Sequence, residues 1–238
     1  MVTHEKLPVP DTIVSYNTKV ARPGFEVVKS IRQILHDNPE TDVLCLQEAQ
    51  GYIDDLRRNF NGGWYLYAKS GWTESMQNPV MVRKKQGFPA RDYTHGWGVV
   101  KNMRHWIGPK HGWDHPGRTW TWVKVGQLYV MSLHRATDGD GQNKRAYIEE
   151  AERLEGFMER RGQKPVVIIG DTNTGLHAQH PGSMQKIKEH VRGKLIADAD
   201  DPGIDYALTS KGVEGIVHRT QHYGSDHQAA VMRRIRVT

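Results

Sequence analysis

The chain has 238 residues, of which 37% are hydrophobic, and a formal net charge of +6. This length supports a substantial core, and the single cysteine, Cys45, excludes an internal disulfide and is expected to be a reduced core residue. The apolar runs are only strand-sized and the first residues carry no apolar signal segment. We therefore expect a soluble, cytoplasmic protein without a membrane span, whose positive charge favours a polyanionic partner.

The first part of the chain alternates buried strands with amphipathic helices. Residues 12–17 and 42–48 are apolar runs that end in a polar side chain, as buried strands do. Helices are predicted near 24–37 and about 52–60. The first helix is predicted to bury Phe25, Val28, Ile31 and Leu35.

The middle of the chain has the pattern of short β segments. Strands are predicted at 64–68 and 79–82, and a hairpin joins 119–125 to 127–133 across Gly126. Residues 83–118 are rich in glycine, histidine, tryptophan and basic residues and show little periodicity.

The last third returns to alternating helix and strand patterns. A helix near 143–161 leads into the β-branched run 165–169, which ends at Gly170, and a short helix follows at 181–192. Two further segments, 203–208 and 224–231, complete the chain. No repeat or linker is present, so we expect one domain, residues 1–238, with mixed sheets and helices outside them.

Polar side chains follow the ends of the predicted strands, and each has an ordinary structural explanation. A turn explains Asn17 or Asp205, a helix N-terminal carboxylate explains Glu48, and an Asx turn explains Asp171 with Asn173. His134 can be a satisfied histidine, and Asp226 with His227 can be a loop before the last strand. Joint occurrence at several strand ends favours a shared site instead.

Six of these segments resemble the ordered motifs of the endonuclease/exonuclease/phosphatase superfamily, the fold of pancreatic deoxyribonuclease. They are Ser15-Tyr16-Asn17, Leu46-Gln47-Glu48, Leu133-His134, Gly170-Asp171-Thr172-Asn173, Ile204-Asp205-Tyr206 and Ser225-Asp226-His227. The resemblance spans about residues 12 to 231. It implies a four-layer α/β (α+β) sandwich of two packed mixed β-sheets flanked by helices, and a metal-dependent hydrolase of phosphate esters.

The resemblance also implies a role for each motif residue. Glu48 would be the principal metal ligand, with Asn17 and Asp226 completing the metal environment directly or through water. Hard oxygen ligands select Mg²⁺ or Mn²⁺ over zinc.

The catalytic roles that the resemblance implies fall on five residues. His227 would be the general base or electrostatic partner of the attacking water, and Asp205 would orient it. Asp171 would position the nucleophile or assist the leaving group. Asn173 and His134 would donate hydrogen bonds to phosphate oxygens.

The segment 101–119 is where we expect substrate specificity. Basic residues that include Lys101 and Arg104 alternate with tryptophans and histidines, which suits a nucleic acid, whereas packing of the tryptophans on the sheet is the alternative. Arg135 is a further candidate to line the cleft. We therefore expect a monomeric nuclease acting on DNA or RNA. The alternatives are a phosphatase or phosphodiesterase of a nucleotide or lipid headgroup, and a non-catalytic nucleic-acid-binding module.

Overall fold

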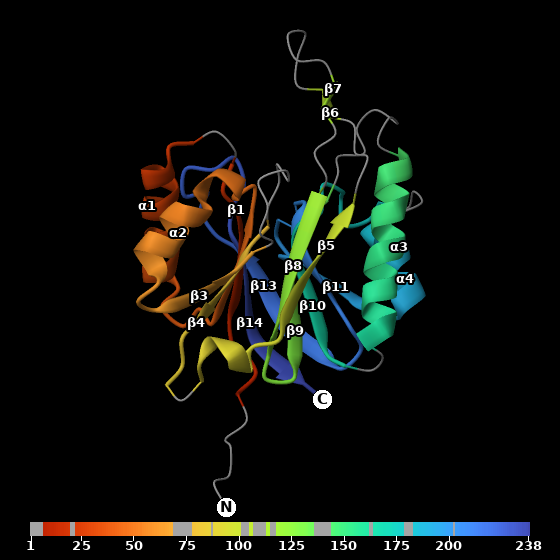
Figure 1. Ribbon diagram of the computed structural model, residues 1–238. Coiled ribbons are helices and arrows are strands. Elements are labelled where there is room, and N and C mark those ends of the chain that lie inside the picture. Colours follow the sequence, from red (N-terminus) through yellow and green to blue (C-terminus); the bar gives the residue numbers. More distant parts are fainter. Residues whose placement is uncertain are drawn as a thin grey trace, which may run out of the picture.

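Two six-stranded sheets lie face to face, with helices on both outer sides (Figure 1). This arrangement is seen in a computed structural model. It describes residues 7–19, 22–68, 78–86, 88–100, 105–106, 113–114, 118–135, 144–161, 164–178, 183–201 and 203–238. Among these residues, no helix is both long and apolar enough to cross a bilayer.

The first sheet is covered by the two helices that follow its central strands. Its strand order is β13 (Val213–Arg219), β14 (Ala230–Val237), β1 (Ile13–Asn17), β2 (Val43–Gln47), β4 (Val80–Arg83) and β3 (Trp64–Tyr67). The helices are α1 (Gly24–Asp37) and α2 (Ile53–Phe60), the latter preceded by the short 3-10 helix η1 (Gln50–Tyr52). Both lie on the same outer face of this sheet (Figure 1).

The second sheet is built in the same way and is covered by the other two helices. Its strand order is β11 (Lys194–Ile196), β12 (Asp205–Thr209), β10 (Val166–Asp171), β9 (Leu128–His134), β8 (Arg118–Val125) and β5 (His95–Val100). The helices are α3 (Lys144–Arg161) and α4 (Met184–Val191). Outside the sheets lie η2 (Ala90–Asp92) and the two-residue strands β6 (His105–Trp106) and β7 (Trp113–Asp114), which pair with each other.

Three apolar clusters hold these four layers together. The central cluster lies between the sheets, and it includes Ile13, Cys45, Val130 and Ile169. One outer cluster packs α1 and α2 on the first sheet, and the other packs α3 and α4 on the second. Burial of apolar surface on both faces of each sheet is the main stabilising contribution, and it explains why β1, β2, β9 and β10 are mostly apolar on both faces. The expected four-layer sandwich is confirmed.

Two parallel strand pairs determine where the polar side chains at the strand ends lie close together. The strand β1 pairs in parallel with β2, and β9 pairs in parallel with β10. The carboxyl ends of such a pair lie at the same edge of a sheet. The antiparallel strand β12 starts at this edge, where Asp205 is paired with Asp171, and β14 starts beside β1.

The sequence patterns missed several strands and misplaced part of one helix face. No strand was predicted for β5, β11 or β13, and the last strand extends beyond 231 to Val237. Val28 and Ile31 are buried as predicted, but Phe25 is not, because its side chain is 72% exposed. The other buried residues of α1 are Val27, Ser30 and Ile34.

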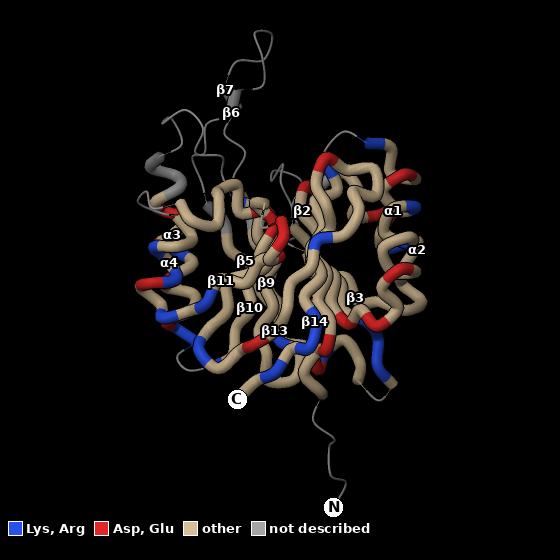
Figure 2. The backbone as a smooth tube through the Cα atoms, turned by 180° about the vertical axis from the view of Figure 1, so that it is seen from behind, with Lys and Arg blue, Asp and Glu red and all other residues tan. Residues whose placement is uncertain are grey.

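The basic residues are spread over the molecule. In the view of Figure 2, Lys and Arg occur on the helices of both halves and along β13 and β14, and they do not gather over one sheet. The overall charge of +6 therefore corresponds to no single basic face among the described elements in this view.

Candidate active site

The carboxyl ends of the two parallel pairs each carry a predicted site residue. Asn17 ends β1 and Glu48 directly follows β2, while His134 ends β9 and Asp171 ends β10. In the second sheet, His134 is the direct neighbour of Asp171 across the strand pair. Residues paired in this way point to the same side of the sheet, which here is the side that faces the first sheet.

Gly170 allows β10 to lie close to β9 immediately before Asp171. Its φ is +150°, and a Cβ placed on it would lie 1.9 Å from the backbone oxygen of Leu133. Only glycine fits this close backbone approach without displacing the neighbouring strand. The glycine that closes the apolar run therefore sets the position of Asp171.

A cluster of buried polar side chains fixes how the strands of the two sheets are aligned with each other. The side-chain Nε2 of Gln47 donates to Ser15 Oγ and to Ser132 Oγ, each at 3.1 Å. Ser132 Oγ in turn donates to the backbone oxygen of Leu46 at 2.8 Å. The two bonds that involve Ser132 cross the gap between β2 and β9, and the bond to Ser15 ties Gln47 to β1. Buried polar groups tolerate little displacement because losing a partner is costly. The cluster therefore fixes the position of Glu48, one residue after Gln47, relative to the second sheet.

Side chains from both sheets surround the carboxylate of Asp171. Its Oδ1 accepts a hydrogen bond from the backbone N–H of Asn173 at 2.9 Å, which is the expected Asx turn. Three side-chain nitrogens lie near its Oδ2: Asn17 Nδ2 at 3.1 Å, His134 Nε2 at 3.4 Å and His227 Nε2 at 3.6 Å. The turn and the cluster coexist because they use different oxygens of one carboxylate.

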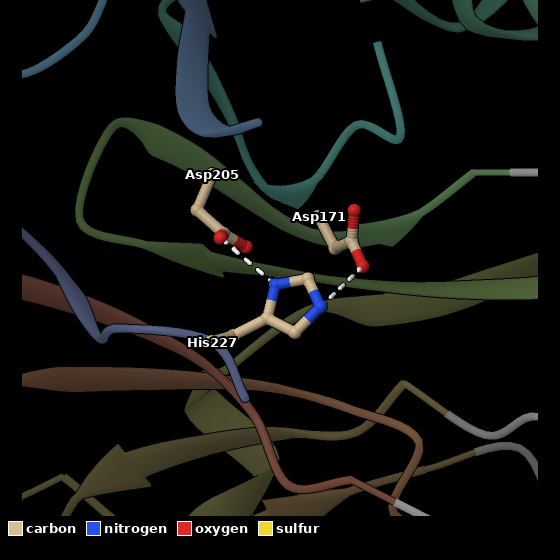
Figure 3. Close-up of side chains that lie close together, drawn as sticks. All are labelled: Asp171, Asp205 and His227. Atoms are coloured by element: carbon tan, nitrogen blue, oxygen red, sulfur yellow. Dashed lines mark hydrogen bonds and ion pairs between the residues drawn. The ribbon is translucent and has the colours of Figure 1, made fainter. Parts of the chain in front are cut away.

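The imidazole of His227 lies between two carboxylates (Figure 3). Its Nδ1 is 2.9 Å from Asp205 Oδ2, while its Nε2 faces Asp171. Burial alone disfavours the imidazolium, but the hydrogen bond to Asp205 and the nearby carboxylates outweigh it and raise the pKa of His227 to about 9. The Asp205 contact also fixes which ring nitrogen faces Asp171.

Burial dominates the chemistry of Asp171. The side chain is only 1% exposed. Desolvation, together with the charge of Asp205, raises the pKa of Asp171 to about 6, against the opposing effects of His227, Asn173 and Asn17. A carboxyl group with a pKa near neutrality can take up or release a proton during a reaction.

Glu48 joins the cluster through Asn17 and His134. It adopts a left-handed backbone conformation with φ of +56°, rare for a residue with a side chain. Its Oε1 is 3.4 Å from Asn17 Nδ2 and 3.8 Å from His134 Nε2. The Oδ1 of Asn17 accepts from the backbone N–H of Lys19, so Asn17 turns its amide nitrogen toward the carboxylates and orients them in this arrangement.

Asp226 and Asn173 have contacts that bear on their predicted roles. The carboxylate of Asp226 is 60% exposed and forms an ion pair with Lys19 at 3.5 Å, outside the cluster around Asp171. Asn173 also has a positive φ, +49°, and its Nδ2 donates to the backbone oxygen of Arg135 at 2.7 Å. Asn173 therefore fixes the turn that carries it, whatever else its side chain contacts.

The prediction that Arg135 binds substrate does not agree with its position. Its side chain is fully buried and its Nε is 3.2 Å from Glu150 Oε2 on α3. Consecutive strand residues point to opposite sides, so His134 faces the gap between the sheets and Arg135 faces the helix. The other two basic candidates, Lys101 and Arg104, lie outside the described residues.

Sequence reasoning missed the residues that support the site from within the core. Ser132 and Glu150 are buried polar residues that none of the strand-end motifs includes, and Gln47 was part of the motif Leu46-Gln47-Glu48 but was given no role. For Glu150 a signal existed, since it lies four residues before Leu154, a buried residue of α3. A carboxylate on a buried helix face predicts a buried cationic partner.

The chain belongs to the endonuclease/exonuclease/phosphatase family. The model of that family matches residues 14–227, a span that contains every cluster residue described above. Members of this family are hydrolases of phosphate esters and are generally dependent on a divalent metal ion. No curated protein matches the chain at the level of sequence.

Solved structures with different activities in their names share the fold. The human Nocturnin catalytic domain with bound sulfate matches with a TM-score of 0.63 and 14% identity, covering 98% of this chain and 97% of that one. The AP endonuclease of Leishmania major matches with a TM-score of 0.61 and 14% identity, covering 95% and 87%. The mannosyl-6-phosphatase Bt3783 of Bacteroides thetaiotaomicron matches with a TM-score of 0.55 and 14% identity, covering 93% and 98%. At these identities the likeness shows the fold alone.

Proposed function

We propose that the protein is a divalent-metal-dependent phosphoesterase that hydrolyses phosphodiester bonds of DNA or RNA. The observation that carries the proposal is the placement of His227 between Asp205 and Asp171, with His134 also beside Asp171 and Glu48 beside His134. Both halves of the site are thus joined through one buried carboxylate. Hydrolysis of a phosphate ester needs a proton acceptor for water beside a centre that stabilises negative charge.

The carboxylates of Glu48 and Asp171 are hard oxygen ligands of the kind that Mg²⁺ and Mn²⁺ prefer. Glu48 is a carboxylate with a 17% exposed side chain at the edge of the cluster, a hard ligand reachable from solvent. The group Asp171, Asp205 and His227 is also close enough to hold an ion. However, its histidine and Asp205 already share a 2.9 Å hydrogen bond, which favours proton transfer there and metal binding at Glu48. A bound ion would supply Lewis-acid stabilisation of charge on the phosphate and leaving oxygens.

His227, Asp205 and Asp171 would carry out the proton transfer. Asp205 holds Nδ1 of His227, so that Nε2 is the atom that faces Asp171. With a pKa of about 9 the ring is protonated at neutral pH in the metal-free protein, so it would stabilise negative charge on the attacking water, and it would accept the proton of that water where a bound cation lowers this pKa. Asp171 would orient that water or return a proton to the leaving oxygen, because its raised pKa favours both states near neutral pH. His134, which lies 3.4 Å from Asp171, would donate to a phosphate oxygen.

The charge of the chain and its structural relatives bear on whether the substrate is a polymer. A net charge of +6 and the likeness to an AP endonuclease support a nucleic acid. The likeness to a mannosyl-6-phosphatase supports a second candidate, a phosphatase or phosphodiesterase of a small phosphorylated molecule. The same side chains serve both reactions, so the candidates differ in what binds beside the phosphate.

One assay separates these functions. The protein is incubated with supercoiled plasmid, single-stranded DNA, RNA, sugar phosphates and a generic phosphodiester, with Mg²⁺ or Mn²⁺ and with chelator. A nuclease degrades polymer only with metal, whereas a small-molecule esterase spares polymer. His227→Ala and Asp171→Ala should each lower turnover by about a hundredfold or more, the usual size of such contributions. Near-normal turnover in both variants would refute the assignment.

A further inference from the structure

An exposed tryptophan lies on the same side of the second sheet as the catalytic cluster. Trp97 on β5 pairs with Thr121 on β8, which pairs with Ser132 on β9. Directly paired residues point to the same side. Ser132 hydrogen-bonds to Gln47 and Leu46 of the first sheet, so this row of side chains faces the gap between the sheets. Trp97 faces the same way.

The row that contains His134 and Asp171 is the next one on that side. His134 lies two residues after Ser132 on β9, and two strand spacings separate β9 from β5. With strands about 4.8 Å apart and about 3.4 Å per residue, the Cα atoms of Trp97 and His134 are about 12 Å apart. An indole ring extends several ångströms from its Cα, and a base next to a phosphate is offset from it by a similar distance, so a separation of about 12 Å is one that a nucleotide at the cluster can span.

Trp97 is exposed to solvent, although β5 contacts the first sheet two residues earlier. Two residues before Trp97 on β5, the ring of His95 packs on Tyr67 of the first sheet, with 4.6 Å between the ring centroids. Trp97 itself is 49% exposed, one of few large apolar side chains with high exposure among the described residues. An indole exposed to water lacks the hydrophobic stabilisation that burial would provide. Its exposure is explained if the ring binds a ligand.

The backbone beneath Trp97 is held rigidly from the other side of the sheet. Cβ atoms placed on Gly96 and Gly98 would lie 2.7 Å from the ring of Trp122 and 2.1 Å from the ring of Trp120. Both indoles therefore lie directly against β5, and only glycines leave room for them. Trp122 also packs on Phe157 of α3. A strand at the sheet edge thus presents Trp97 from a preorganised backbone, which lowers the entropic cost of binding.

We propose that Trp97 is a stacking platform for an unpaired nucleobase next to the phosphate that the cluster hydrolyses. This rests on the proposed function and narrows it to substrates with an exposed base, such as single-stranded DNA or RNA. Aromatic side chains bind successive bases of single strands through their π faces and tolerate any base. A sugar phosphate has no such face, so Trp97 separates the two candidate functions.

The test measures binding and cleavage separately. Binding of a labelled short single-stranded DNA, the matching RNA, a duplex and an abasic oligomer of equal length is followed by fluorescence anisotropy with chelator present. Cleavage of the same oligomers is followed with Mg²⁺ or Mn²⁺. The variants are Trp97→Ala, Trp97→Leu and Trp97→Phe. Ile216→Ala is the control, because Ile216 is 42% exposed on β13 at the far edge of the first sheet.

Stacking predicts a specific pattern across these variants. Trp97→Ala and Trp97→Leu should weaken binding of base-containing single strands about 10- to 100-fold and raise KM with little change in kcat, the size expected for one stacked base. Trp97→Phe should restore most of the affinity, and the abasic oligomer and Ile216→Ala should show no difference from wild type. Unchanged affinity in Trp97→Ala, or equal losses for abasic and base-containing oligomers, would overturn the inference.

The same measurements distinguish this inference from the proposed function. If the wild-type protein cleaves polymer and Trp97→Ala does so with the same KM, the stacking platform is refuted and the nuclease stands. If the wild-type protein binds single strands through Trp97 and cleaves none with any metal, the nuclease is refuted and the platform stands. Hydrolysis of small phosphate esters without binding of any oligomer would overturn both.

Discussion

Nδ1 of His227 lies 2.9 Å from Oδ2 of Asp205, although the two residues are separated by 21 others in the chain. The contact joins the loop before β14 in the first sheet to the first residue of β12 in the second. A histidine held in this way keeps one tautomer and a raised pKa, about 9 rather than 6.5. The catalytic proposal depends on this relationship more than on any other.

Replacing Asp205 tests what its carboxylate contributes to His227 while His227 itself is kept. In Asp205→Asn the hydrogen-bond geometry can persist, but the negative charge is lost, and the pKa of His227 should fall from about 9 toward its ordinary value of 6.5. Turnover should fall by about a hundredfold or more. An NMR titration of the His227 ring protons in the metal-free protein checks the pKa, and an unshifted titration would contradict the role of Asp205.

The same pKa shift makes the stability of the metal-free protein depend on pH. The folded pKa of His227 lies above the unfolded one, so its contribution is complete below about pH 6.5 and is lost as pH rises through about 9. The shift corresponds to a change in unfolding free energy on the order of 2–3 kcal/mol. Urea unfolding across this range measures it, with chelator present.

Two variants serve as matched controls for that pH dependence. Asp205→Asn should flatten the decline in unfolding free energy between about pH 6.5 and 9, because the cause of the raised pKa is removed. His190→Gln should leave the decline in place, because His190 and its partner Glu159 are both exposed. A decline that persists in Asp205→Asn would assign the pH dependence to other groups.

Glu48 and Asp226 should respond differently when they are neutralised, although the resemblance implies metal contact for both. Glu48→Gln should raise the Mg²⁺ concentration for half-maximal activity at least about tenfold, because it removes the principal hard ligand. Asp226→Asn should change it by less, since Asp226 is 60% exposed and paired with Lys19. Metal titrations of activity decide between the two, and equal effects would mean that Asp226 reaches the metal.

The buried pair Arg135–Glu150 should act by holding the turn that carries the site. The backbone N–H of Arg135 donates to the backbone oxygen of Asp171 at 3.0 Å, and its own carbonyl accepts from Asn173. Arg135→Met leaves a buried carboxylate without the guanidinium that faces it and should lower the unfolding free energy by about 3–5 kcal/mol. Thermal and urea unfolding measure that loss.

The double variant Arg135→Met with Glu150→Leu tests positioning apart from stability. Replacing both buried charges by apolar groups should restore most of the unfolding free energy. If the pair also positions the turn, kcat should remain about tenfold low while KM changes little, since the cluster around Asp171 is less well held. Full recovery of kcat would restrict the pair to a structural role.

The sequence was most informative where the strands are buried on both faces. The ends of β1, β2, β9 and β10 could be located because apolar runs stop there, and these ends carry Asn17, Glu48, His134 and Asp171. The sequence could not show how the two sheets pack against each other. This packing brings Gln47 of the first sheet into contact with Ser132 of the second. Such contacts between sheets join residues far apart in the chain and leave no local pattern.

The strand β5 was missed because its glycines resemble a loop. Gly96 and Gly98 lower strand propensity, but they are required where Trp120 and Trp122 lie against the backbone. The strand β13 was missed although its buried and exposed residues partly alternate, Val213 and Val217 being buried. In both cases partners elsewhere in the sheet outweigh the local preference, and in β5 this hid the position of Trp97.

Gly170 should be among the least tolerant positions of the chain, and Gly175 nearby offers a control. In Gly170→Ala the new Cβ would lie 1.9 Å from the Leu133 oxygen at a φ of +150°, so β9 and β10 must separate beside Asp171. We expect a loss of at least about 3 kcal/mol in unfolding free energy and loss of activity. Gly175→Ala meets nothing within 4 Å and should be nearly neutral. Urea unfolding and turnover of both variants check this, and a stable, active Gly170→Ala protein would show that the close approach of the two strands is not needed to place Asp171.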